Sequence, residues 1–157
     1  MNILTEKQIS YIAGIIDGEG NISVNRQKQK GGKDWNYHIH VVITNTKIEL
    51  LKYIQELTKI GNIYQNVDDR PNHNKSWRWY LTNNEIKPFL EVIINDLMIK
   101  KKQAKLMLEF IDLKKHKANR YYTVPLEISI ERELIWEELR ELNRKGIINN
   151  GVDYVVF

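Results

Sequence analysis

The chain has 157 residues, of which 42% are hydrophobic and 28% charged, a balance that fits one folded domain and excludes a disordered segment. Cysteine is absent, which excludes disulfides and thiolate zinc sites. Neither a secretory signal nor an apolar run of about 18 residues is visible, so we expect an intracellular protein that makes no contact with membranes.

Positive charge is segregated along the sequence. Lys and Arg number 24 against 20 Asp and Glu, a net charge of +4. The basic residues cluster between Arg26 and Lys33, between Lys100 and Lys105, and between Lys114 and Arg120, whereas acids concentrate between Glu127 and Glu141. Such segregation favours a polyanionic partner on one face. Solvated helix faces produce similar charge runs and remain an alternative.

The first expected element is a helix that begins near Glu6. Thr5 and Gln8 form a T-x-x-Q capping box, which marks a helix start. Apolar residues then recur at helical spacing on one face: Ile9, Ile12, Ala13 and Ile16. A second face is also apolar or small: Tyr11, Gly14, Ile15 and Gly18. We therefore expect this helix to be covered on both faces.

From Asn21 the period of the pattern becomes two, which predicts strands. Strands over 21–27 and 35–43 form a hairpin with its turn at Gly31-Gly32. A helix over about 47–59, closed by Gly61, precedes a second hairpin over 62–67 and 76–82. Helices over about 85–95, 100–115 and 128–144 follow. The order α-β-β-α-β-β-α-α-α predicts one α+β domain over residues 1–157, with a core over 5–145 and a tail over 146–157.

The polar face of the four expected strands is unusual in its composition. It carries Asn, Gln, Ser, His, Arg and Tyr, where a plain solvated sheet favours Lys, Glu and Thr. These side chains supply both donors and acceptors, as recognition of base edges requires. An ordinary solvent-facing sheet remains the alternative. His38 and His40 form an H-x-H pair, but no third zinc ligand lies nearby, so we expect no zinc.

The stretch IAGIIDGEG, residues 12–20, spends three glycines and two acids at the end of the first helix. Each glycine inside a helix costs about 1 kcal/mol, and acids are unfavourable at a helix C-terminus. Gly14 and Gly18 allow a second helix to approach closely, and the natural partner is the same helix of a second copy. Two Glu19 carboxylates would then meet and could hold Mg²⁺ together with the Gly18 carbonyl. The alternative is a simple helix stop with a solvated Glu19.

This stretch resembles the motif of the LAGLIDADG homing endonucleases, and the order of elements extends the resemblance over most of residues 5–145. Ala13, Gly14, Asp17 and Gly20 match the motif, while Gly18 replaces alanine and Glu19 replaces the second aspartate. The chain is most similar to single-motif members. The resemblance implies an αββαββα fold whose four-stranded antiparallel sheet binds DNA, followed by extra C-terminal helices.

The resemblance also implies a function: a homodimeric, intron-encoded homing endonuclease that makes double-strand breaks with short 3′ overhangs in near-palindromic double-stranded DNA. Its cofactor would be Mg²⁺, with Mn²⁺ or Ca²⁺ able to substitute for binding. Location in an organelle or a prokaryotic cytoplasm would follow. The scaffold also resembles intron maturases and non-cleaving DNA-binding regulators, and RNA is expected as a partner only in the maturase alternative.

Roles for individual residues follow from the resemblance. Glu19 would hold metal, assisted by the Gly18 carbonyl, while Asn45 and Lys100 would assist catalysis. Glu49 stands where some relatives carry a basic residue. The dimer interface would comprise Tyr11, Gly14, Ile15, Asp17 and Gly18. The DNA-binding residues would be Ser23, Asn25, Gln27, Asn36, His38, His40, Asn66, Asp68, Ser76, Arg78 and Tyr80, with Lys28, Lys30 and Lys33 on phosphates.

Overall fold

The structure is a computed structural model that describes residues 2–28, 35–66, 75–116 and 124–144. Its elements in chain order are α1 (Glu6–Glu19), β1 (Gly20–Lys28), β2 (Trp35–Asn45), α2 (Ile48–Thr58), β3 (Asn62–Gln65), β4 (Trp77–Tyr80), α3 (Asn83–Ile93), α4 (Lys101–Lys114) and α5 (Leu126–Leu142). This order confirms the expected α+β class. Among these helices, none combines the length and apolarity needed to cross a membrane.

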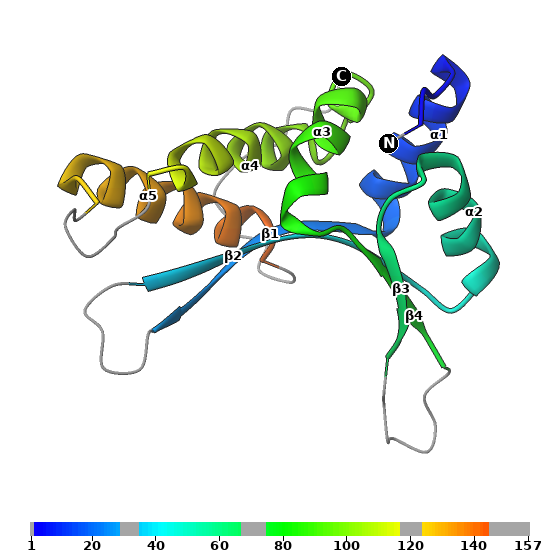
Figure 1. The fold of residues 1–157 in the computed structure, drawn as a ribbon, viewed down its shortest axis with the longest axis horizontal. Helices are drawn as coiled ribbons and strands as arrows, with labels where there is room; N and C mark the ends of the chain where they lie inside the picture. The colour runs from blue at the N-terminus through cyan, green and yellow to red at the C-terminus, as the bar shows by residue number, and fades with distance from the viewer. Residues whose placement is uncertain (1, 29–34, 67–74, 117–123, 145–157) are drawn as a thin grey trace, which may run out of the picture.

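The four strands form one antiparallel sheet in the order β1-β2-β4-β3. Its longest ladder joins β1 to β2, from Gly20 opposite Ile43 to Lys28 opposite Trp35. The sheet is arched, and the labelled helices lie on its convex side while its concave side stays open (Figure 1). The helices therefore cover one face and leave the other for a partner.

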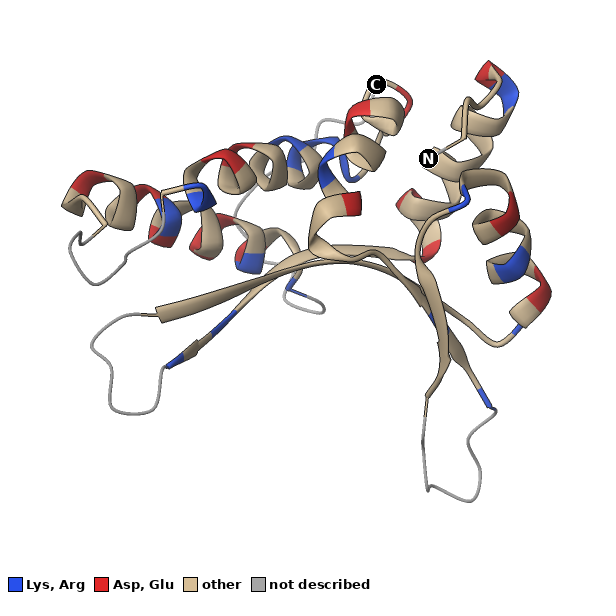
Figure 2. Ribbon diagram, in the orientation of Figure 1, with Lys and Arg blue, Asp and Glu red and all other residues tan. Residues whose placement is uncertain are grey.

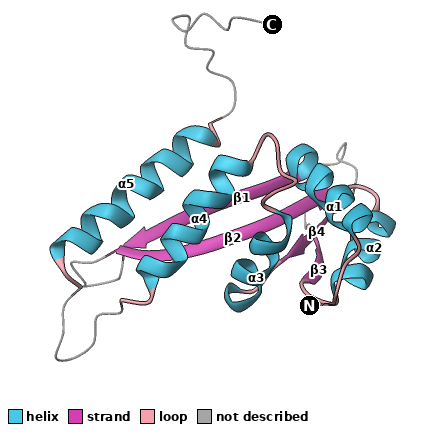
Figure 3. Ribbon diagram, turned by 90° about the horizontal axis from the view of Figure 1, so that it is seen from above, coloured by secondary structure: helices cyan, strands magenta, loops and turns pink. Residues whose placement is uncertain are grey.

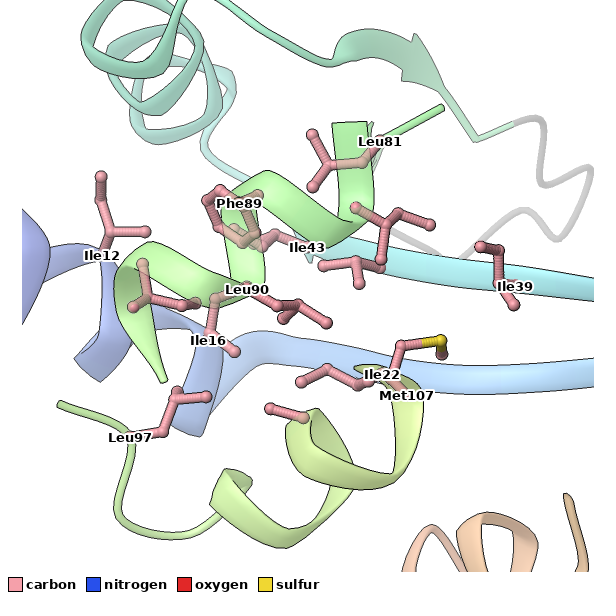
Figure 4. Packing of buried hydrophobic residues seen from close by; sticks show 14 of the residues in the cluster. Ile12, Ile16, Ile22, Ile39, Ile43, Leu81, Phe89, Leu90, Leu97 and Met107 are labelled. Atoms are coloured by element: carbon pink, nitrogen blue, oxygen red, sulfur yellow. The ribbon is translucent and has the colours of Figure 1, made fainter. Parts of the chain in front are cut away.

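The core lies between the sheet and the helices. Period two in the strands puts Ile22, Ile39 and Ile43 on the helix side, where each is at most 5% exposed. Ile16 of α1, Leu90 of α3 and Met107 of α4 enter the same cluster (Figure 4). Seen from above, α4 and α5 lie side by side across β1 and β2 (Figure 3). The expected inward faces of the strands are confirmed.

Arg26 illustrates how strand alternation overrides a charge cluster. The sequence groups it with the basic loop residues, but its position in β1 turns it toward α5. Its guanidinium stacks over Trp136, with the carbon 3.6 Å from the ring centroid, and pairs with Glu133. Tyr37 donates a hydrogen bond to the same carboxylate at 2.8 Å. Arg26 therefore fastens α5 to the sheet and does not extend the basic patch.

The link from α2 to β3 differs in detail from the expectation. Lys59, with φ of 55°, caps the helix in the left-handed conformation expected two residues later. Gly61 also has a positive φ of 80°, and a Cβ there would lie 2.3 Å from the indole nitrogen of Trp79. That nitrogen donates to the Ile60 carbonyl at 3.0 Å. Gly61 is thus needed for the packing of a fully buried tryptophan.

Helix α3 begins at Asn83, two residues before the expected start at Glu85. The Glu85 carboxylate accepts hydrogen bonds from the backbone N–H and the hydroxyl of Thr82, both at 2.7 Å. Partial burial would raise the pKa of Glu85, but these bonds and one from the Gly61 N–H hold it below its ordinary value. A second T-x-x-E capping box therefore sets the start of this helix.

Candidate metal site and nucleic-acid interface

The end of α1 passes directly into the central hairpin, which places the motif at the middle of the arch. Gly20 is the C-cap of α1 and the first residue of β1, and its N–H donates to the Ile16 carbonyl. A Cβ at Gly20 would lie 2.6 Å from that carbonyl oxygen. The last glycine of the motif is therefore required by the helix-to-strand turn itself.

The other two glycines have no such reason within the chain. A Cβ added at Gly14 or at Gly18 meets no atom within 4 Å in the described residues. Both lie with Tyr11, which is 46% exposed, on the face of α1 turned away from the core. Ile15 is half-buried and packs against the core cluster. The described residues of one copy therefore leave Gly14 and Gly18 uncovered on this second face.

Asp17 is engaged at the start of α4. Its carboxylate accepts hydrogen bonds at 2.8 Å from the backbone N–H groups of Met98 and Lys100. Partial burial would raise the pKa of this carboxyl, but these N–H donors, with that of Ile99, hold it below its ordinary value. The Lys100 ammonium donates to the backbone carbonyl of Asp17. Asp17 and Lys100 therefore join the C-terminus of α1 to the N-terminus of α4.

Glu19, two residues later, has a different environment. It is exposed at the end of α1, and its carboxylate forms no hydrogen bond or ion pair with another residue of the described ranges. Gly18, also exposed, precedes it. Within the described ranges, no three His, Asp or Glu side chains of one copy gather as a metal site. Mg²⁺ commonly takes one or two carboxylates and completes its shell with water and substrate phosphates, so the Glu19 carboxylate is a donor of the kind that this cation accepts.

Asn45 and Lys100, the two expected catalytic helpers, lie close to this end of α1 in the topology. Gly20 pairs with Ile43, so the last residues of β2 run beside the motif. Asn45 ends that strand, and its side-chain oxygen accepts a hydrogen bond from the Lys47 N–H at 2.8 Å, which shapes the entry to α2. Glu49 is exposed in the first turn of that helix. The catalytic roles of Asn45 and Lys100 stay predictions.

The outward face of the β1–β2 hairpin brings the expected polar residues together in pairs. Ser23 lies opposite His40, Asn25 opposite His38, and Gln27 opposite Asn36. Partial burial lowers the pKa of His40, and the positive charges of His38 and Lys114 lower it further. Neutral imidazole has one donor and one acceptor nitrogen, which suits readout of base edges. The sequence therefore located this face correctly.

The second hairpin continues the same face. Arg78 is exposed and Tyr80 half-exposed on β4. Asn66 donates to the Ser76 hydroxyl at 2.7 Å, so these two side chains bind one another across the hairpin. Lys28 is exposed at the end of β1. Lys30, Lys33, Asp68, the Gly31-Gly32 turn and the tail 146–157 lie outside the described residues.

Three residues that the sequence analysis did not name line a hollow on this concave face. Val42, Tyr64 and Gln65 surround a space of about 450 Å³ together with His40, Asn66, Arg78 and Tyr80. Strand alternation gives Val42 the same face as His40, so period two in the sequence was the signal that could have found it. The hollow lies beside the two central strands, β2 and β4.

Charge is distributed to suit a polyanion on this face. None of the four described strands contains Asp or Glu, whereas Lys28 and Arg78 are exposed on them. Acidic residues appear on the helices of the convex side and at the end of α1 (Figure 2). Phosphates approaching the concave face would therefore meet no carboxylate along the strands.

Comparison with solved structures supports the fold. I-CvuI, a homing endonuclease solved in complex with the I-CreI target in the presence of Mg, has a TM-score of 0.72 and 18% identity, covering 91% of this chain and 85% of that one. I-Vdi141I, an archaeal intron-encoded homing endonuclease complexed with DNA, gives 0.73 and 22%, covering 90% and 87%. I-CeuI, a group I intron-encoded homing endonuclease also complexed with DNA, gives 0.68 and 18%, covering 95% and 72%.

Sequence comparison identifies the family. No curated relative matches the chain. The family model described as LAGLIDADG endonuclease matches residues 12–116, beginning at the first residue of the IAGIIDGEG motif. That match spans more than half of the 157 residues and includes both hairpins. The chain therefore belongs to the LAGLIDADG endonuclease family, whose motif its sequence resembles.

Proposed function

We propose that this protein is a site-specific homing endonuclease that acts as a homodimer and uses Mg²⁺ to break both strands of a near-palindromic DNA site. One observation carries the proposal: a Cβ at Gly14 or Gly18 of α1 would meet no atom of the described residues within 4 Å, and the Glu19 carboxylate at the end of this helix forms no hydrogen bond or ion pair with them. A second copy on this face would cover the glycines and bring two such carboxylates together. Family membership and the DNA complexes of its structural neighbours support the substrate class.

The dimer follows from the shape of α1. A two-fold axis lets the same face meet itself, so Gly14 of each copy would oppose the other helix at short range. The hydrogen bonds of Asp17 to the Met98 and Lys100 N–H groups fix where α1 ends. They would therefore fix the position of Glu19 in each copy, while its carboxylate stays available to bind the cation.

The cleavage chemistry would depend on the two Glu19 carboxylates and on two neighbouring residues, Lys100 and Asn45. Glu19 and the Gly18 carbonyl would hold the cation, whose chemistry is activation of attacking water and stabilisation of the leaving oxygen. Lys100 donates to the Asp17 carbonyl, which offsets the negative end of the α1 dipole next to Glu19. Its ammonium would stabilise negative charge on a nearby phosphate. Asn45, at the end of β2, would order water beside it.

Recognition would belong to the open concave face. Each arched sheet would lie in the major groove of one half-site about one helical turn long, so the full site would span about 20 base pairs. The paired polar side chains on β1 and β2 would meet base edges. Lys28 and the other basic residues beyond the strands would bind phosphates, which position the protein without specifying sequence. Short 3′ overhangs are the expected product.

The experiment that tests this proposal is selection of cleaved sites from a randomised DNA library in Mg²⁺, with Glu19→Gln as the matched control. We expect one near-palindrome cut only by the wild type, because glutamine keeps the shape of glutamate and removes its charge. The variant should lose cleavage by about a thousandfold or more while its DNA affinity is retained. Normal cutting by Glu19→Gln would refute the metal assignment. Enriched binding without any cleavage would favour a maturase or regulator.

A further inference from the structure

Val42 stands apart on the recognition face. Among the outward-facing residues of the four described strands, it is the one aliphatic side chain. Its neighbours along β2 on the same face are His40 and Thr44, and it lies opposite Asn21 on β1 and Tyr80 on β4. Within the described residues, Val42 is therefore a partly exposed valine amid polar side chains.

The surroundings of Val42 form an apolar wall with polar edges. The rings of Tyr64 and Tyr80 lie 5.7 Å apart between centroids and are tilted by 41°. Val42 and these rings line the hollow of about 450 Å³. Its remaining lining residues carry hydrogen-bonding groups: His40, Gln65, Asn66 and Arg78. An occupant of this hollow would therefore present a small apolar group surrounded by donors and acceptors.

The major-groove edge of DNA has one apolar feature, the C5 methyl group of thymine. The other groups on that edge are hydrogen-bond donors and acceptors, which the polar rim can serve. Resting on the proposed function, we propose that Val42, walled by Tyr64 and Tyr80, is a specificity-determining residue that selects thymine in each half-site by contact with this methyl group. Cytosine, which offers an amino donor and no methyl, would leave Val42 against water.

The test uses deoxyuridine, which differs from thymidine only by lacking the methyl group. The near-palindrome selected by the wild-type homodimer is resynthesised with each thymine replaced in turn, symmetrically in both half-sites, and affinity is measured in Ca²⁺. We expect one position at which the replacement weakens wild-type binding by about fourfold per half-site, because burying one methyl group contributes about 0.8 kcal/mol and 1.4 kcal/mol is tenfold. Val42→Ala should bind both forms of that position equally.

Asn25→Ala is the matched control, since it alters the same face on a different strand. It should bind each resynthesised form of the selected site more weakly and yet keep the methyl dependence. The inference is overturned if wild-type protein shows no methyl-dependent position, a result that needs no variant to fold. It is overturned equally if Val42→Ala retains the full dependence. Failure to enrich any DNA sequence would overturn the proposed function, whereas an enriched site without methyl dependence would overturn this inference alone.

Discussion

The two faces of α1 follow opposite packing rules. On the inner face Ile12, Ala13 and Ile16 are fully buried, and their side chains belong to the core between the sheet and the helices. On the outer face, a Cβ added at Gly14 or Gly18 would meet no atom of the described residues within 4 Å. Alanine at either position would stabilise an isolated helix by about 1 kcal/mol. Folding of one copy thus explains the inner face, whereas nothing in the described residues of one copy explains the glycines of the outer face.

The two carboxylates at the end of α1 repeat this contrast. Asp17 accepts two backbone hydrogen bonds from the segment before α4 and so stabilises the fold. Glu19 is exposed, and its carboxylate forms no hydrogen bond or ion pair within the described part of the chain. Asp17 and Glu19, which carry the same charge two positions apart, therefore differ in that only Asp17 is engaged by the fold. Substitutions that act on one face and spare the other will break or sharpen this comparison.

The largest effect on the stability of the chain is expected at Gly20, which belongs with the inner face. Gly20→Ala would place a Cβ 2.6 Å from the Ile16 carbonyl oxygen and 2.8 Å from its Cα, both backbone atoms. Relief requires movement of the helix end, which costs about 1–3 kcal/mol. Chemical denaturation should show this loss in the free energy of unfolding. An unchanged denaturation midpoint would show that the turn between α1 and β1 adjusts freely.

Much of this architecture could be predicted from the sequence because its signals are local. The capping box of Thr5 and Gln8 and the alternation through Ile39, Val41 and Ile43 depend on residues a few positions apart. Strand alternation also predicted which polar side chains of β1 and β2 share the outward face, and the register of the two strands confirms it. The start of α3 was missed although its signal, Thr82 with Glu85, is equally local.

The remaining details depend on contacts between residues far apart in the sequence. Nothing near Asp17 indicates that its carboxylate binds N–H groups 81 and 83 residues later. Its expected role at the partner helix stays a prediction, and the structure adds a role within its own chain. Likewise, the stacking of Arg26 on Trp136 joins β1 to α5 and could not be read from a basic cluster. Long-range pairing of this kind is fixed by tertiary packing.

Asp17→Asn should produce the next largest effect, a loss of about 1–2 kcal/mol, because the amide can accept at only one oxygen and presents an N–H group toward another donor. In the folded wild-type protein, partial burial would raise the pKa of the Asp17 carboxyl, but the backbone hydrogen bonds hold it below its ordinary value of 3.8. The carboxylate therefore contributes stability above its unfolded pKa and loses it as pH falls through the folded value. Unfolding measured at about pH 7 and about pH 3 should show the two proteins converging in acid. A constant difference would contradict the hydrogen-bonded carboxylate.

The smallest effect, and one of opposite sign, is expected from Gly14→Ala on the outer face. A Cβ at Gly14 would meet no atom of the described residues within 4 Å. The free energy of unfolding of the variant monomer should therefore be about 1 kcal/mol larger than that of the wild type. The same methyl group would separate the two closely packed helices of the proposed dimer. Sedimentation equilibrium should therefore show that the variant dimer dissociates at a higher protein concentration than the wild type. Gly18→Ala is the control, since the family motif accepts alanine there and the dimer should persist. A variant that is more stable yet equally dimeric would mean that the partner meets α1 away from Gly14.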